Sequence, residues 1–186
     1  MDWSSLYQQG LDYNSYLLQH GSPTDQGKWQ ASFEAAALRP EQLDVLQSFK
    51  RKMYLLCMSG AWCGDCVEHC PIFHRFESEC PHIELRFIDR DANAELKAAL
   101  TICGSARVPQ TVILSEDFLY VSRLGDRPLS KYRDMAARIQ GAACSTGFVV
   151  AGTPLRLAVI QDWLNEVERS QLVLQTSPGL RQRHND

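Results

Sequence analysis

Two cysteines lie three residues apart in Ser59-Gly60-Ala61-Trp62-Cys63-Gly64-Asp65-Cys66. This stretch follows a short apolar run, residues 53–58, and it opens a segment of helical character. A cysteine at the N-terminus of a helix faces unpaired backbone N–H groups and the positive end of the helix dipole, and both favour a thiolate. A second cysteine three residues later lies on the same helical face, close enough to close a small disulfide. The stretch therefore predicts a reversible dithiol.

The elements around the dithiol predict a mixed sheet. The run 53–58 is continuously apolar, which is typical of a central strand that is buried on both faces. Further along, the pattern predicts a helix over 63–80, a strand over 82–88, a helix over 93–103, strands over 110–114 and 119–122, and a helix over 129–139. This order predicts an α/β fold: a mixed central sheet with helices on both faces, whose first connections are right-handed crossovers.

Helical extensions flank this mixed region. Apolar spacing predicts helices over 4–20 and 25–38, and a third helix that begins at Pro40. A stripe of apolar residues within 154–174 predicts a late helix, which packs either on the domain or on a second copy of the chain. Residues 141–152 are ambiguous, and the polar segment 176–186 is expected to fray. We therefore divide the chain into residues 1–50, 51–140 and 141–186.

Composition and charge narrow the classes of function. Of the 186 residues, 45% are hydrophobic and 22% are charged, which is close to the globular average. A net charge of −3 and the lack of a basic cluster argue against nucleic-acid binding. We find no signal-peptide pattern and no apolar run of the roughly 18 residues that a membrane span needs. The seven cysteines are odd in number and scattered, as expected for free thiols in a reducing compartment. We therefore expect a cytoplasmic protein.

Four features at compatible separations resemble the thioredoxin superfamily over roughly residues 50–140. They are Trp62-Cys63-Gly64-Asp65-Cys66, Pro71 five residues after the second cysteine, Val108-Pro109 before a predicted strand, and Gly125 after the predicted hairpin. The chain looks most like bacterial thioredoxin-like proteins that have a Trp-Cys-Gly-Asp-Cys site and a helical N-terminal region. The resemblance implies a thioredoxin-like domain over 51–140.

The resemblance also implies roles for single residues. Cys63 would be the exposed nucleophile that forms a mixed disulfide with the substrate, and Cys66 would be the buried resolving thiol. Pro109 would follow a cis peptide bond, and its turn would place the Val108 backbone beside the dithiol, ready to pair with an extended peptide. Trp62 would supply an apolar surface next to the sulfur.

Two residues depart from the pattern of thioredoxins. Those proteins bury an aspartate six residues before the first cysteine, and here that position is Cys57. Asp65 adds a negative charge near the thiolate, which opposes its formation. We therefore expect Cys57 and Asp65 to tune the dithiol toward a reductant or a specialised site rather than a strong oxidant.

The resemblance implies a thiol–disulfide oxidoreductase that exchanges a Cys63–Cys66 dithiol with protein disulfide substrates. It implies no bound cofactor, and a reductase or a small thiol would supply the electrons. Two alternatives stay open: a binding module with a non-catalytic dithiol, and a metal or cluster protein that uses Cys63, Cys66 and Cys70. The default expectation for Cys57 and Cys70 is burial in the core, and for His69 and His74 it is solvation.

Overall fold

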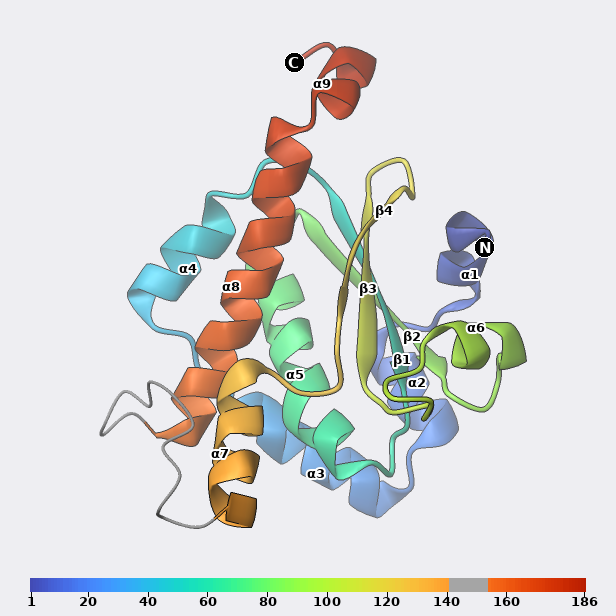
Figure 1. The fold of residues 1–186 in the computed structure, drawn as a ribbon, viewed down its shortest axis with the longest axis vertical. Coiled ribbons are helices and arrows are strands. Elements are labelled where there is room, and N and C mark those ends of the chain that lie inside the picture. The colour runs from blue at the N-terminus through green and yellow to red at the C-terminus, as the bar shows by residue number, and fades with distance from the viewer. Residues whose placement is uncertain (141–153) are drawn as a thin grey trace.

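The computed structural model describes residues 1–140 and 154–186, and it places a four-stranded mixed sheet at the centre (Figure 1). The strands, in the sheet order β2-β1-β3-β4, are β2 (Ile83–Asp89), β1 (Met53–Ser59), β3 (Gln110–Ser115) and β4 (Tyr120–Leu124). Strand β1 pairs in parallel with β2 and antiparallel with β3, and β3 pairs antiparallel with β4. The predicted mixed sheet is confirmed, with the apolar β1 in its interior.

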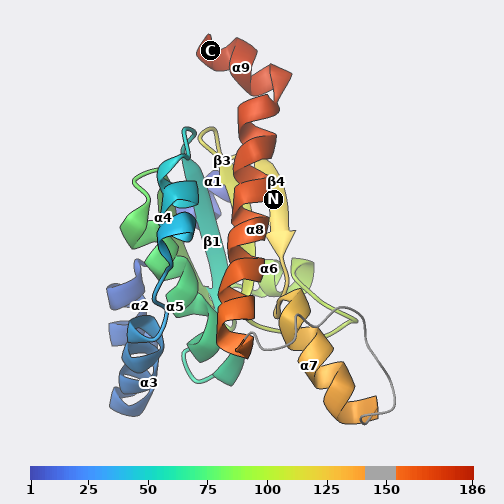
Figure 2. The same cartoon turned by 90° about the vertical axis from the view of Figure 1, so that its left-hand side faces the viewer.

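Helices cover both faces of the sheet, as the views in Figures 1 and 2 show. One face carries α5 (Gly64–Glu79) and α8 (Leu155–Thr176), with α3 (Pro23–Glu34), α4 (Pro40–Gln47) and α7 (Leu129–Gln140) packed around them. The other face carries α1 (Trp3–Gln9) and α6 (Ala94–Ala99). Because strand side chains alternate between faces, Cys57 and Ser59 point toward α5, whereas Tyr54 meets the ring of Tyr7 on α1.

The single helix predicted over 4–20 is two helices, α1 and α2 (Tyr13–His20). The break occurs because Leu11 pairs with the edge of β2, its N–H and C=O bonding Phe87 at 2.9 and 2.7 Å. Gly10 makes this approach sterically feasible, since a Cβ there would lie 2.7 Å from the Cβ of Arg86. The N-terminal extension therefore extends the sheet at its β2 edge and does not simply lie over it.

Helix α8 packs on the chain's own core. Of the predicted stripe, Ile160, Trp163, Leu164 and Val167 are buried, whereas Leu157 is 37% exposed. The predicted helix is confirmed, and most of its apolar stripe packs on the chain itself. The side chain of Gln171 fastens α8 to the residue that precedes β1: its amide donates to the Arg51 carbonyl at 2.9 Å and accepts from the Arg51 N–H at 3.0 Å. Within residues 1–140 and 154–186, no helix is both long and apolar enough to cross a membrane.

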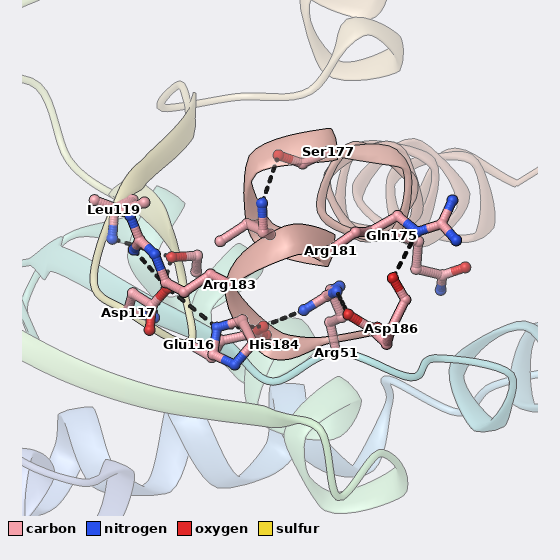
Figure 3. Close-up of polar contacts among 12 residues, drawn as sticks. Arg51, Glu116, Asp117, Leu119, Gln175, Ser177, Arg181, Arg183, His184 and Asp186 are labelled. Carbon is pink, nitrogen blue, oxygen red and sulfur yellow. Dashed lines mark hydrogen bonds and ion pairs between the residues drawn. The ribbon is translucent and has the colours of Figure 1, made fainter.

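The prediction of a frayed segment over 176–186 is wrong, because this segment contains α9 (Pro178–His184). Leu180 is buried, and the nearly buried guanidinium of Arg51 pairs with Glu116 and Asp186. Arg183 and His184 reach Asp117 at 2.7 and 3.1 Å. These side chains form a charged cluster that fixes α9 to the β3–β4 turn (Figure 3). A polar segment is thus held by ion pairs to residues that are distant in the sequence. The ambiguous residues 141–152 lie outside the described ranges.

Candidate functional site

The dithiol lies where β1 passes into α5. Cys63 is the N-cap residue of α5, with φ −79° and ψ 128°, and Gly64 opens the helix. The Cys63 N–H donates to the Gly60 carbonyl at 2.9 Å, which closes a tight turn between strand and helix. Cys66 follows in the first helical turn and is completely buried. The predicted pair therefore consists of one partly exposed thiol at a helix N-terminus and one buried thiol behind it.

The segment before β3 lies against the exposed thiol. Cys63 Sγ is 3.6 Å from the carbonyl oxygen of Val108, and the Val108–Pro109 peptide bond is cis. The side chain of Gln110 fixes this segment by donating to the carbonyls of Leu100 and Arg107 at 2.6 and 2.8 Å. The predicted helix over 93–103 ends earlier, at Ala99, and leaves the following residues free to form the turn toward Val108.

Trp62 provides an exposed aromatic surface at the site. Its side chain is 58% exposed, and the Arg90 guanidinium carbon lies 4.9 Å from the centre of its ring. Burial of so large an apolar surface by a bound partner would be favourable. The structure therefore brings together Trp62, Cys63 and Val108, three residues that the sequence analysis placed in one site.

The two thiols of the pair affect each other's ionisation. The hydrogen bond with Cys66, together with burial, raises the pKa of the Cys63 thiol. Against the effect of burial, hydrogen bonds from Cys63, Cys70 and Ser59 lower the pKa of the Cys66 thiol. Cys66 is therefore the thiol of the pair that ionises more readily.

Behind the dithiol, two side chains of β1, Cys57 and Ser59, meet Cys70 of α5. Cys57 Sγ and Cys70 Sγ are 3.8 Å apart, and Ser59 Oγ is 3.6 Å from Cys70 Sγ. All three side chains are completely buried. Cys57, at the position where thioredoxins bury an aspartate, therefore contacts sulfur rather than water.

Asp65 lies in the first turn of α5, and its charge is compensated. Arg127 Nε donates to its carboxylate at 3.0 Å, and Arg127 Nη2 donates to the second oxygen at 2.5 Å. One turn further along, Glu68 pairs in the same way with Lys131 at 2.5 Å. Since the cation lies beside the carboxylate, the repulsion that we expected between Asp65 and a thiolate is reduced.

The expectation that His69 is solvated is wrong. Its side chain is completely buried on α5, with the ring of Trp163 5.6 Å away, and neither ring nitrogen has a hydrogen-bond partner. Burial lowers the pKa of His69 to about 3, with Lys131 and Arg156 acting in the same direction and Asp65 opposing them. His74 is only partly buried, and its ring stacks on Tyr13 with centroids 4.0 Å apart.

One cluster in the described ranges has the donor atoms of a metal site: ligand atoms of Asp65, Glu68 and His69 lie within 4.8 Å of one another. Both carboxylates already have a cationic partner, and a metal ion would have to displace Arg127 and Lys131. The cluster contains none of the cysteines of the metal alternative, which was Cys63, Cys66 and Cys70. Cys70 instead contacts Cys57 and Ser59 in the core.

Trp29 is a positioning residue that the sequence analysis did not identify. It lies on α3, is completely buried, and donates its indole N–H to the Ala61 carbonyl at 2.9 Å. Ala61 belongs to the turn that carries Trp62 and Cys63, so the N-terminal extension supports the dithiol directly. The only sequence signal was an aromatic residue within a predicted helix, which indicated core packing and nothing more.

Comparisons with known proteins agree with this architecture. A family model described as thioredoxin matches residues 10–140. A protein of unknown function from Pseudomonas aeruginosa, PA1234, has a similar structure, with 21% identity, a TM-score of 0.66, and coverage of 91% of this chain and 96% of that one. An HIV 4E10 epitope scaffold is 24% identical with a TM-score of 0.69, covering 91% of this chain and 99% of its own. No curated protein matches the chain.

The two solved structures show a shared fold, whereas the family match covers most of the chain and includes the dithiol and the Val108–Pro109 bond. The chain therefore belongs to the thioredoxin family.

Proposed function

We propose that this protein is a thiol–disulfide oxidoreductase that reduces disulfides of protein substrates through Cys63 and Cys66. One observation carries the proposal: a partly exposed thiol at the N-terminus of α5 lies 3.6 Å from the Val108 carbonyl, with the buried thiol of Cys66 behind it. The N-terminus of α5 stabilises negative charge on this pair of thiols, and the exposure of Cys63 admits a second sulfur.

The reaction proceeds by two exchanges. Cys63 Sγ attacks one sulfur of the substrate disulfide, its proton passes to Cys66, and the other substrate sulfur leaves. Cys66 Sγ then attacks Cys63 Sγ in the mixed disulfide, which releases the second substrate sulfur as a thiol and leaves a Cys63–Cys66 disulfide. A reductase or a small thiol returns two electrons and two protons to the pair. The need for such a donor favours a reducing compartment, and we propose the cytoplasm.

The residues around Cys63 define how a substrate is held. The Val108 backbone offers hydrogen-bonding groups beside the sulfur, so an extended peptide could align there as an added strand. The exposed ring of Trp62 would pack on the apolar side chains of that peptide. Asp65 and Cys57 act as tuning residues in this proposal: Arg127 balances the charge of Asp65, and Cys57 replaces a carboxylate by a buried thiol.

The test is reduction of insulin disulfides, followed by turbidity, with dithiothreitol or glutathione as electron donor. The wild type should turn over, Cys63→Ser should be inactive, and Cys103→Ser should match the wild type because Cys103 is an exposed cysteine outside the pair. Cys66→Ala should accumulate mixed disulfides at Cys63. Lack of turnover that depends on Cys63, with every donor, would refute the proposal and favour a binding module with a non-catalytic dithiol.

A further inference from the structure

Four sulfur atoms extend from the surface into the core along β1 and α5. Cys63 is partly exposed, and Cys66, Cys70 and Cys57 are completely buried behind it. Cys63 caps α5, and Cys66 and Cys70 follow within that helix, four residues apart and on the same face. The last two sulfurs, on Cys70 and Cys57, are 3.8 Å apart. The four cysteines therefore form a row in which helix geometry relates the first three and a direct contact joins the last two.

The inner pair has the placement that a disulfide requires. Its two cysteines come from β1 and from α5, which covers that face of the sheet, and their sulfur atoms lie 3.8 Å apart. A disulfide bond is about 2.05 Å long, so closure from 3.8 Å brings the two sulfur atoms about 1.8 Å closer together. Ser59 Oγ, 3.6 Å from Cys70 Sγ, offers a hydroxyl for proton transfer.

Burial decides how electrons can reach the inner pair. Since Cys57 and Cys70 are completely buried, a dissolved thiol or a protein disulfide cannot contact either sulfur in the folded chain. Cys66 belongs to the outer pair and also lies one helical turn before Cys70 on the same face of α5. Electrons can therefore enter and leave the inner pair through Cys66.

We propose that Cys57 and Cys70 are a second redox pair, which reduces the Cys63–Cys66 disulfide from within and gives each chain a reserve of two electrons. This inference rests on the proposed function, because that reaction forms the Cys63–Cys66 disulfide.

The transfer is a pair of internal exchanges. The Cys70 thiolate attacks Cys66 Sγ, the Cys63–Cys66 bond breaks, the Cys66–Cys70 bond forms, and Cys63 leaves and takes up the proton that Cys70 lost. Cys57 then attacks Cys70 Sγ, the Cys66–Cys70 bond breaks, the Cys57–Cys70 bond forms, and the proton of Cys57 passes to Cys66. Two electrons move from the inner dithiol to the outer disulfide, and no outside reagent is consumed.

The internal exchange should be slower than the first reduction of substrate. Burial raises the pKa of the Cys70 thiol well above its ordinary value, so its thiolate is scarce. We expect fully reduced protein to release its electrons in two phases, a fast phase from the outer pair and a slow phase from the inner pair.

The test counts thiols after a reaction without an electron donor. Fully reduced chain, freed of reductant, is mixed with excess insulin, quenched in acid, denatured, labelled with N-ethylmaleimide and weighed by mass spectrometry. Wild type should lose four of its seven labelled thiols. Cys57→Ala and Cys70→Ala should each lose two. Cys80→Ala removes a buried cysteine outside the row and should still lose four.

The outcomes separate this inference from the proposed function. A wild-type loss of two thiols overturns the inference and leaves the proposed function intact, whether or not the variants fold. A loss of none overturns both. A loss of four with a Cys57–Cys70 linkage found by peptide sequencing, and abolished in Cys63→Ser, supports both.

Discussion

The free energy of unfolding of the wild-type chain should fall on acidification. Replacing His69 by leucine should make this fall smaller. His69 is completely buried, and both ring nitrogens lack a hydrogen-bond partner. Burial, reinforced by the neighbouring cations Lys131 and Arg156, lowers its pKa to about 3 in the folded state. In the unfolded chain the ordinary value is about 6.5. The folded state therefore holds His69 neutral, and unfolding allows it to bind a proton.

The sign and the size follow from these two values. Between about pH 6.5 and about pH 3 the unfolded state binds one more proton, so the free energy of unfolding falls as the pH falls, by up to ~1.4 kcal/mol per pH unit. From pH 7 to pH 5 the loss due to His69 is roughly 2 kcal/mol. At pH 7 the leucine variant should be at least as stable as wild type, to within about 1 kcal/mol, because it removes two unpaired buried polar atoms.

Urea unfolding at pH 7 and pH 5 measures this loss directly. Other groups contribute equally to both proteins, so the quantity to compare is the wild-type difference minus the His69→Leu difference. His82→Leu, which changes a partly exposed histidine, is the matched control and should keep the wild-type difference. If His69→Leu loses as much stability as wild type between the two pH values, His69 is not held neutral in the folded chain and the argument fails.

Three further variants test other contacts. Trp29→Phe keeps the buried ring but loses the hydrogen bond to the Ala61 carbonyl, so insulin reduction should slow while the chain stays folded; an unchanged rate would remove the positioning role of Trp29. Trp62→Ala should raise KM for a protein disulfide with little change in stability, and Trp62→Phe should restore most of the affinity. Equal KM values for wild type and Trp62→Ala would contradict a role of the exposed Trp62 ring in substrate binding. Gln171→Ala loses both bonds to the Arg51 backbone and should lower the free energy of unfolding by about 2 kcal/mol; an unchanged urea midpoint would contradict this.

Local patterns in the sequence were sufficient for the sheet and the dithiol. The continuous apolar run after Lys52 could only be an interior strand, and the cysteine spacing placed both thiols on one face of the helix that follows. Such signals depend on neighbours along the chain, and they predicted the order of elements from β1 to α7 with small errors at the ends. The resemblance to thioredoxins added Val108 and Pro109, whose position beside Cys63 no local pattern reveals.

Three other features depend on contacts between elements that are distant in the sequence. The break at Gly10 depends on the edge of β2, and the order of residues 176–186 depends on the distant Arg51. The burial of His69 depends on α8, which supplies Trp163. Periodicity reports which face of an element is apolar, but it does not report which element will cover that face.

The dithiol itself shows this division most clearly. The sequence placed Cys63 and Cys66 within one turn at the start of α5, because a separation of three residues is fixed by helix geometry. Only the tertiary structure showed that Cys57, on a strand, reaches Cys70, on a helix, at 3.8 Å, and that both are closed off from solvent. The physical reason is that a contact between two elements depends on how the sheet and its helices pack, whereas a spacing within one helix does not.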